Sequence, residues 1–162
     1  MLREKFFYVE NATDRFLPLP NPVIVGYGLN KTMKIKIHKI QPSQLYISEI
    51  KFKKVWKNFD CKNYEPLPIK ELDGEIILTD GHTRALVAYL KGIREVKVEW
   101  ETEEWDWDLY RLCVKWCKKQ KIRKISDLRN RIVSENEYEH LWLERCKKAG
   151  EELKKPDFKG TK

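Results

Sequence analysis

Alternation of apolar and polar residues predicts the strands of a small sheet. Residues 34–40 alternate isoleucine with basic side chains, and residues 95–100 repeat the pattern with valine. Period-two alternation is typical of a strand with one buried face. Between these stretches, residues 67–72 and 75–79 are two apolar runs joined by Asp73-Gly74, a dipeptide that favours a two-residue hairpin turn.

Helical spacing of apolar residues predicts helices in the gaps and throughout the C-terminal part. Ser48 is an expected N-cap for a helix that reaches Phe59, and a second helix runs from residue 81 to a stop at Gly92. The first helix has an expected buried side of Ile50, Val55 and Phe59, flanked by Phe52 and Trp56.

Beyond residue 100 the pattern is helical. We expect helices near 106–119 and, capped by Ser126, near 126–132, while Ser134 and Glu137 form a capping box for a last helix. The expected apolar side of that helix is Tyr138, Leu141, Trp142 and Cys146. The predicted fold is α+β, with an N-terminal arm over 1–33 that holds a short strand at 23–25, a sheet domain over 34–100 and a helical extension over 101–162.

Composition indicates a globular protein, because 41% of the 162 residues are hydrophobic and 36% are charged. No apolar run is long enough to cross a bilayer, and the N-terminus lacks the pattern of a secretory signal. We therefore expect a cytoplasmic protein that does not enter a membrane. The four cysteines are expected to be reduced and packed in the core.

Positive charge is concentrated in one segment. The net charge is +8, and residues 111–131 hold nine basic side chains against one acid, Asp127. Such a cluster attracts the phosphates of nucleotides or nucleic acids, and it is equally typical of a solvated helix face.

Candidate chemistry gathers at the turn Asp80-Gly81-His82-Thr83-Arg84, where a buried strand ends and a helix begins. Free N–H groups and the positive end of the helix dipole favour an anion there. Gly81 permits close approach, His82, Thr83 and Arg84 can donate hydrogen bonds, and Asp80 can hold a metal ion. A purely structural turn is the alternative, with Asp80 as the N-cap, His82 satisfied locally and Arg84 paired with Glu49 or Glu71.

The stretch from Ile35 to Trp100 resembles the ParB/sulfiredoxin superfamily, in which a strand, a short helix and a hairpin precede a Gly-x-x-Arg turn that opens a helix. Sulfiredoxins carry a nucleophilic cysteine where this chain has His82, which argues against their chemistry. Partition proteins, which bind CTP, typically carry Gly-Glu-Arg-Arg or Gly-Glu-His-Arg. The free-serine kinases carry Asp-Gly-His-x-Arg, which this chain matches at Asp80, Gly81, His82 and Arg84.

The kinase resemblance implies transfer of a phosphoryl group from a nucleotide, ADP or ATP, to a small hydroxyl substrate such as free serine, with Mg²⁺. It implies catalytic roles for Asp80, His82 and a carboxylate after the first strand. The matching position is Gln44, so Glu49 is the next candidate. Asp80 is the expected metal ligand, and residues 81–84 are expected to bind the nucleotide.

A second function class is a DNA-binding, partition-like or nuclease-like adaptor. In that case the helices near 106–119 and 126–133 would form a helix-turn-helix variant, and the segment 111–131 would contact nucleic-acid phosphates.

Overall fold

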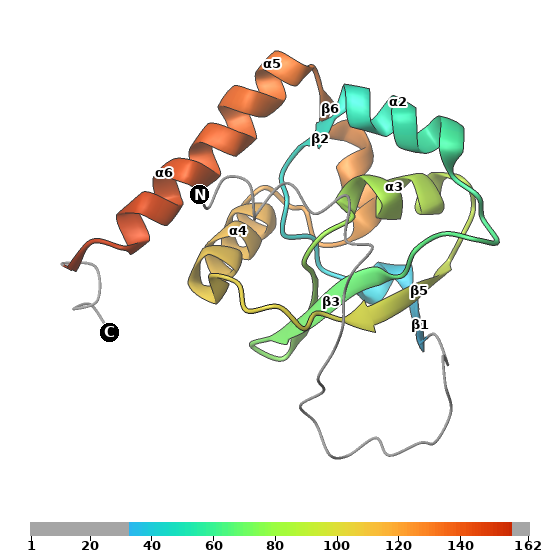
Figure 1. Ribbon diagram of the computed structural model, residues 1–162, viewed down its shortest axis with the longest axis horizontal. Helices are drawn as coiled ribbons and strands as arrows, with labels where there is room; N and C mark the ends of the chain where they lie inside the picture. Colours follow the sequence, from blue (N-terminus) through green and yellow to red (C-terminus); the bar gives the residue numbers. More distant parts are fainter. Residues whose placement is uncertain (1–32, 157–162) are drawn as a thin grey trace.

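The computed structural model describes residues 33–156, and the arm with its predicted strand at 23–25 lies outside them. The fold is α+β (Figure 1). A four-stranded mixed sheet has the order β1-β5-β3-β4, made of β1 (Met33–Lys36), β5 (Glu95–Trp100), β3 (Leu67–Leu72) and β4 (Glu75–Leu78). Only the central pair, β3 and β5, is parallel.

The hairpin between β3 and β4 forms as the sequence predicts. Asp73 and Gly74 both have positive φ, 53° and 80°, which matches the right-handed twist of two antiparallel strands. The backbone of Gln41 extends this edge of the sheet, since its N–H donates to the Ile76 carbonyl and its carbonyl accepts from Leu78.

The first predicted strand is shorter than expected. β1 ends at Lys36, and Ile37–Lys39 forms a 3-10 turn. Ile37 is buried, and its N–H still donates to the carbonyl of Arg94, the next residue in the register of β1 and β5, before the chain turns away. The turn redirects the chain so that Gln41 reaches the edge of β4 on the far side of the sheet.

Helix α2 (Glu49–Asn58) has its N-cap at Ser48 as predicted, but its expected buried side is only partly correct. None of its residues is buried, and Ile50 is 62% exposed. Phe52 and Phe59 are the partly buried side chains that pack against the core. The helix packs on α3 (His82–Leu90) at the outside of the molecule, so it has only a narrow contact face (Figure 1).

The C-terminal part contains α4 (Trp107–Lys119), α5 (Glu135–Tyr138) and α6 (Glu144–Leu153). The Ser134–Glu137 capping box forms, and α5 continues through a π-helical stretch, Glu139–Leu143, into α6 (Figure 1). Trp142 is completely buried, whereas Leu141 is 42% exposed, contrary to expectation. The wider π turn changes the angular spacing of the side chains, so a regular 3.6-residue pattern misplaces Leu141.

The helix predicted near 126–132 is also wrong. Ile125–Asn130 is a 3-10 helix, and Ile132–Val133 is a strand, β6, paired in parallel with β2 (Ile47–Ser48). Asp127, rather than Ser126, satisfies the start of this turn by accepting from the N–H groups of Arg123 and Lys124. Ile132 and Val133 pair with β2 and therefore do not continue the helix.

One hydrophobic core joins the sheet to the C-terminal helices. Its buried members include Ile69 and Val96 from the sheet, Leu86 from α3, Cys113 from α4 and Trp142 from the last helix. The cysteines are free, and Cys61 alone among them is exposed. In the part of the chain that the structure describes, no helix has the length and apolar character to cross a bilayer.

The link between α2 and α5 gives a first testable prediction. The Ser48 hydroxyl accepts from the Lys51 N–H and donates to the Glu135 carboxylate at 2.6 Å. Because Ser48→Ala removes a cap and a charge-assisted hydrogen bond, we expect a loss of about 1–2 kcal/mol in the free energy of unfolding. Urea denaturation measures it, with Ser126→Ala as the control; equal losses in the two variants would contradict the assigned cap.

Candidate functional site

The predicted turn lies at the junction of β4 and α3, and Gly81 occupies the N-cap of that helix. Its φ of 74° is in the left-handed region, which favours glycine. The Asp80 Oδ1 accepts from the Gly81 N–H at 2.7 Å, and the Gly81 carbonyl accepts from Ala85. No side chain caps the helix, so its first N–H groups face the turn with no intrahelical carbonyl to receive them.

The side chain of Arg84 folds back over Gly81. Its Nη2 donates to the Pro66 carbonyl and its Nη1 to the Glu65 carboxylate, each at 3.3 Å. A Cβ atom added to Gly81 would lie 2.9 Å from Arg84 Nη2 and 3.2 Å from Leu67 Cδ2. The guanidinium therefore lies directly against the glycine, and its Nε is buried with no hydrogen-bond partner.

His82 has a different placement from the one expected of a phosphate ligand. The ring is buried, and its Nε2 accepts from the Ser43 N–H at 3.0 Å. Burial lowers the pKa of His82 to about 3, so the ring is neutral at physiological pH, with its remaining proton on Nδ1. The His82 side chain thus attaches the start of α3 to the segment after Ile40, as expected if the turn is purely structural. The backbone N–H of His82 remains in the first turn of the helix.

The other predicted residues divide between the turn and the surface. Thr83 is buried beside His82. Glu49 is exposed at the start of α2 and pairs with Lys53 at 3.0 Å. Gln44 donates to the Tyr46 carbonyl and to the Tyr138 hydroxyl, which directs it to the last helix. Arg84 pairs with Glu65, and not with Glu49 or Glu71 as the structural alternative expected.

Three buried polar residues next to the turn were missed by the sequence analysis. Thr79, directly before Asp80, donates its hydroxyl to Glu101 at 3.0 Å, and its carbonyl accepts from the Tyr110 hydroxyl at 2.9 Å. Glu101 is 6% exposed and also accepts the N–H groups of Thr102 and Glu103. A carboxylate directly after a predicted strand was the available signal for Glu101.

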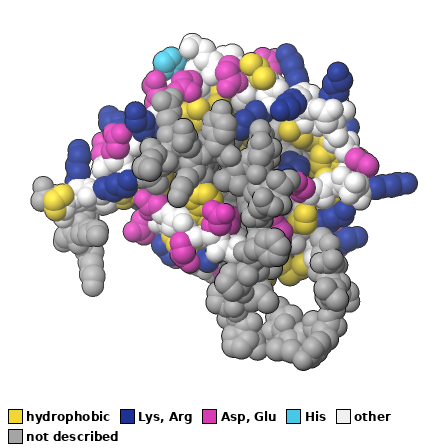
Figure 2. All heavy atoms as spheres, viewed as in Figure 1, with side chains coloured by type: hydrophobic (Ala, Val, Ile, Leu, Met, Phe, Trp, Pro, Cys, Tyr) yellow, Lys and Arg dark blue, Asp and Glu magenta, His cyan; other side chains and the backbone are white. Residues whose placement is uncertain are grey.

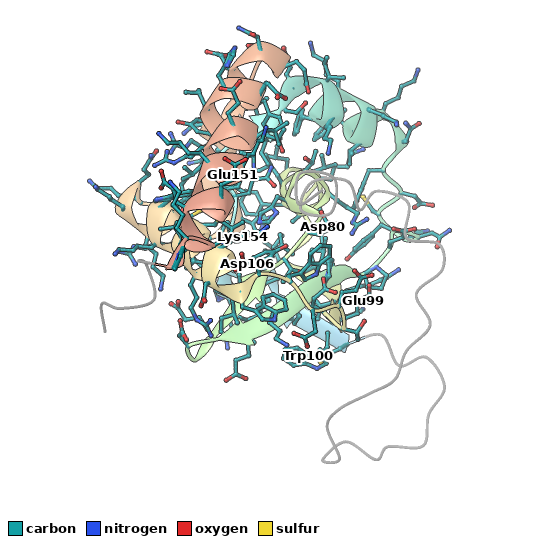
Figure 3. The ribbon with its side chains drawn as sticks, turned by 60° about the vertical axis from the view of Figure 1, so that its left-hand side comes forward. Asp80, Glu99, Trp100, Asp106, Glu151 and Lys154 are labelled. Carbon is teal, nitrogen blue, oxygen red and sulfur yellow. The ribbon has the colours of Figure 1, made fainter. Side chains whose placement is uncertain are left out.

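Negative charge surrounds the Tyr110 hydroxyl. Burial raises the pKa of Tyr110 well above its ordinary value, and the charges of Asp80 and Glu101 raise it further. Figure 3 shows Asp80 at the start of α3 and Asp106 at the start of α4, on the same side of the molecule. The turn thus combines backbone donors and an arginine with a carboxylate, and the Glu101 carboxylate is already occupied by three donors.

The basic segment 111–131 is partly neutralised by the hairpin. Arg111 pairs with Asp73, and Lys118 pairs with Glu75, across a groove of about 550 Å³ whose floor includes Leu72 and Ile77. The second half of the basic segment contains the 3-10 helix Ile125–Asn130, in which Ile125 and Leu128 are buried. A six-residue 3-10 helix followed by a paired strand lacks the recognition helix that the helix-turn-helix prediction required.

Comparison with known proteins assigns no family. No protein-family model matches this chain, and no curated protein matches it. A solved structure that is similar is the crystal structure of protein Atu1540 from Agrobacterium tumefaciens, at 14% identity and a TM-score of 0.40. The match covers 59% of this chain and 60% of that one, so it spans less than two thirds of that protein. A TM-score this low supports no conclusion about fold family or function.

Substitution of Gly81 tests how tightly the turn is built. We expect Gly81→Ala to lower the free energy of unfolding by about 1–2 kcal/mol, the cost of a left-handed conformation with a side chain, and to displace Arg84. Gly92→Ala is the matched control, because Gly92 has φ of 91° and open space around it. Urea denaturation of both variants measures the loss; because, of the two glycines, only Gly81 has neighbours that an added Cβ would meet, equal losses would contradict this geometry.

Proposed function

We propose that the turn at residues 80–84 binds the phosphate groups of a nucleotide, in a domain of the ParB/sulfiredoxin type. The observation that carries the proposal is the placement of the Arg84 guanidinium against the left-handed Gly81 at an uncapped helix start. The N–H groups at the helix start and the forked cation lie next to each other, and donors of these two kinds suit a phosphate.

The turn has one carboxylate, that of Asp80, which could bind Mg²⁺. Asp80 supplies one carboxylate at the turn, and Mg²⁺ bound to a nucleotide needs only one or two protein carboxylates, the rest of its shell being phosphate and water. Within residues 33–156 no group of three or more metal-binding side chains is found. Asp80 would hold the ion through its carboxylate, and the ion would neutralise phosphate charge that Asp80 and Glu101 otherwise repel.

Binding is tested by calorimetric titration of the protein with ADP, ATP, CTP and GTP, each with and without Mg²⁺. We expect micromolar to millimolar affinity for at least one of them. Mg²⁺ should strengthen the binding, because the ion offsets the repulsion between the nucleotide phosphates and the carboxylates of Asp80 and Glu101. Inorganic phosphate separates recognition of phosphate from recognition of the base. Absence of heat and of thermal stabilisation with every nucleotide would overturn the proposal.

Phosphoryl transfer to a small hydroxyl compound is the activity that we propose for the same site. Labelled ADP and ATP incubated with free serine and Mg²⁺ measure it directly. We expect Asp80→Asn to lower Mg²⁺-dependent turnover at least tenfold while nucleotide affinity falls less, because the amide keeps its size and loses its charge. Equal loss of turnover and affinity would contradict a metal-directed role for Asp80.

The basic residues 111–131 offer a second candidate partner, nucleic acid. Lys115, Lys119 and Lys121 are exposed, which is the observation that favours it. Replacing Lys115 and Lys119 with glutamine would weaken duplex binding at every sequence and flatten its salt dependence. Duplex DNA that is not retained by the unmodified protein at low salt would exclude this partner.

A further inference from the structure

A second surface lies along the outer side of α2, the end of α3 and the start of β5, and it borders the Gly81 turn at Glu65, which pairs with Arg84. Residues 49–66 and 89–97 hold eight basic side chains, seven lysines and Arg94, against four acidic ones. Figure 2 shows Lys and Arg side chains along the edge of the molecule where Figure 1 places α2, with apolar side chains between them.

Aromatic rings alternate with these cations. Lys91 Nζ lies 4.8 Å from the centre of the Trp56 ring, the Arg94 guanidinium 4.4 Å from Tyr89, and Lys97 Nζ 4.9 Å from Tyr64. The first pair joins α2 to the residue after α3, the second joins α3 to the loop before β5, and the third joins β5 to the loop after α2. No other part of the described chain has three such pairs drawn from neighbouring elements.

The rings also stack in two pairs. Phe52 stacks on Trp56 with centroids 5.8 Å apart, and Phe59 stacks on Tyr64 at 5.1 Å. Trp56 is 42% exposed although it is the largest side chain of α2. Trp56 thus stacks on Phe52, has Lys91 over its ring, and still leaves a large part of its side chain in solvent.

We propose that this aromatic–basic face binds single-stranded nucleic acid, with a base stacked on Trp56 and the backbone phosphates on the surrounding lysines. Aromatic platforms interleaved with cations fit unpaired bases, whose faces are accessible, and do not fit a duplex, whose bases are stacked internally. Lys91 sits on a flexible stem, so its ammonium can move from the ring to a phosphate when a base takes its place.

The basic segment 111–131 lacks this combination. Its tryptophan, Trp116, is half-buried and lies edge-on to the buried Trp142, with Arg145 over its ring. Lysines alone contact phosphates without distinguishing single strands from duplexes. The aromatic–basic face is therefore the surface of this molecule whose chemistry selects an unpaired strand.

The test is fluorescence anisotropy of labelled oligouridine and oligothymidine, each of about twelve nucleotides, with the full chain. We expect Trp56→Leu to weaken binding roughly fivefold to hundredfold and Trp56→Phe, which keeps a stacking ring, to weaken it much less. Replacing Lys54, Lys57 and Lys91 with glutamine should reduce the slope of log affinity against log salt by about 0.7 for each phosphate that the protein no longer neutralises.

Controls separate this face from the other candidate sites. Lys147→Gln with Lys148→Gln removes two exposed charges on α6 and should leave binding unchanged. Arg84→Ala should also leave it unchanged, and Trp56→Leu should leave nucleotide binding at the turn unchanged, so either proposal can fail alone. Undetectable single-strand binding at low salt would overturn the inference, as would equal affinity of folded Trp56→Leu and the parent. Tighter binding of a duplex of the same length would also overturn it, if measured with Lys115 and Lys119 replaced by glutamine to remove the contribution of the segment 111–131.

Discussion

Arg84→Ala is expected to weaken nucleotide binding roughly tenfold to a hundredfold. A charge-assisted hydrogen bond is typically worth about 1.5–3 kcal/mol, and the guanidinium is the one side-chain cation placed against Gly81 within the described residues. Arg84→Lys should recover only part of the affinity, because an ammonium keeps the charge without the fork. Calorimetric titration with the nucleotide that binds most tightly measures both effects.

A matched control and parallel melting curves separate binding from folding. Arg129→Ala removes an exposed arginine from the 3-10 helix Ile125–Asn130 and should change neither quantity. Arg84 also donates to the Pro66 carbonyl, so a modest loss of stability is expected in Arg84→Ala. A variant with a lowered melting temperature and an unchanged nucleotide affinity would show that the arginine only supports the turn.

Acidification is expected to destabilise the protein through His82. Its pKa is about 3 in the folded chain and about 6.5 in the unfolded chain, so only the unfolded chain gains a proton between these values. The stabilising contribution is complete above about pH 6.5 and is lost progressively as the pH falls towards about pH 3, at about 1.4 kcal/mol per pH unit. From about pH 7 to about pH 5 the loss is about 2 kcal/mol.

Urea denaturation at both pH values measures this loss in the parent and in His82→Gln. The glutamine can still accept from the Ser43 N–H but does not titrate, so the variant should lose about 2 kcal/mol less than the parent over the same range. Other titrating groups are common to both proteins and cancel in the comparison. His38→Gln, a change at an exposed histidine, should follow the parent; identical pH dependence of parent and His82→Gln would refute the assignment.

Turns and helix caps could be predicted from the sequence, because each is determined by residues a few positions apart. The Asp73-Gly74 turn, the Ser48 cap and the Ser134–Glu137 capping box each depend on residues a few positions apart, and all three form. The strands β3, β4 and β5 also lie where the sequence predicts them, because their alternation or apolar content matches a sheet with one or two covered faces.

Features that depend on distant contacts could not be predicted in this way. The strand β1 is cut short because the chain turns after Ile37 and brings the backbone of Gln41 to Ile76 and Leu78 at the other edge of the sheet. Ile132 and Val133 become a strand because Ile47 and Ser48 supply a partner. Ile50 is exposed because α2 lies at the outside of the fold, and the helical spacing of apolar residues does not predict where a helix will lie.

The candidate site shows the same division. Gly81 as a left-handed helix start and Arg84 beside it follow from the local motif, and both are found at the turn. The partners of these residues are not local: Ser43 holds His82, Glu65 pairs with Arg84, and Glu101 lies under Thr79. Which residues become these partners is decided by tertiary packing, and a local motif does not contain that information.

Amide chemical shifts of the turn test the central proposal most directly. In ¹H–¹⁵N spectra of labelled protein titrated with the Mg²⁺-nucleotide, we predict the largest shifts at the backbone N–H groups of Gly81, His82 and Thr83, with Arg84 side-chain signals changing at the same concentrations. Shifts confined to residues of the aromatic–basic face or of the segment 111–131, with the turn unchanged up to saturation, would contradict it.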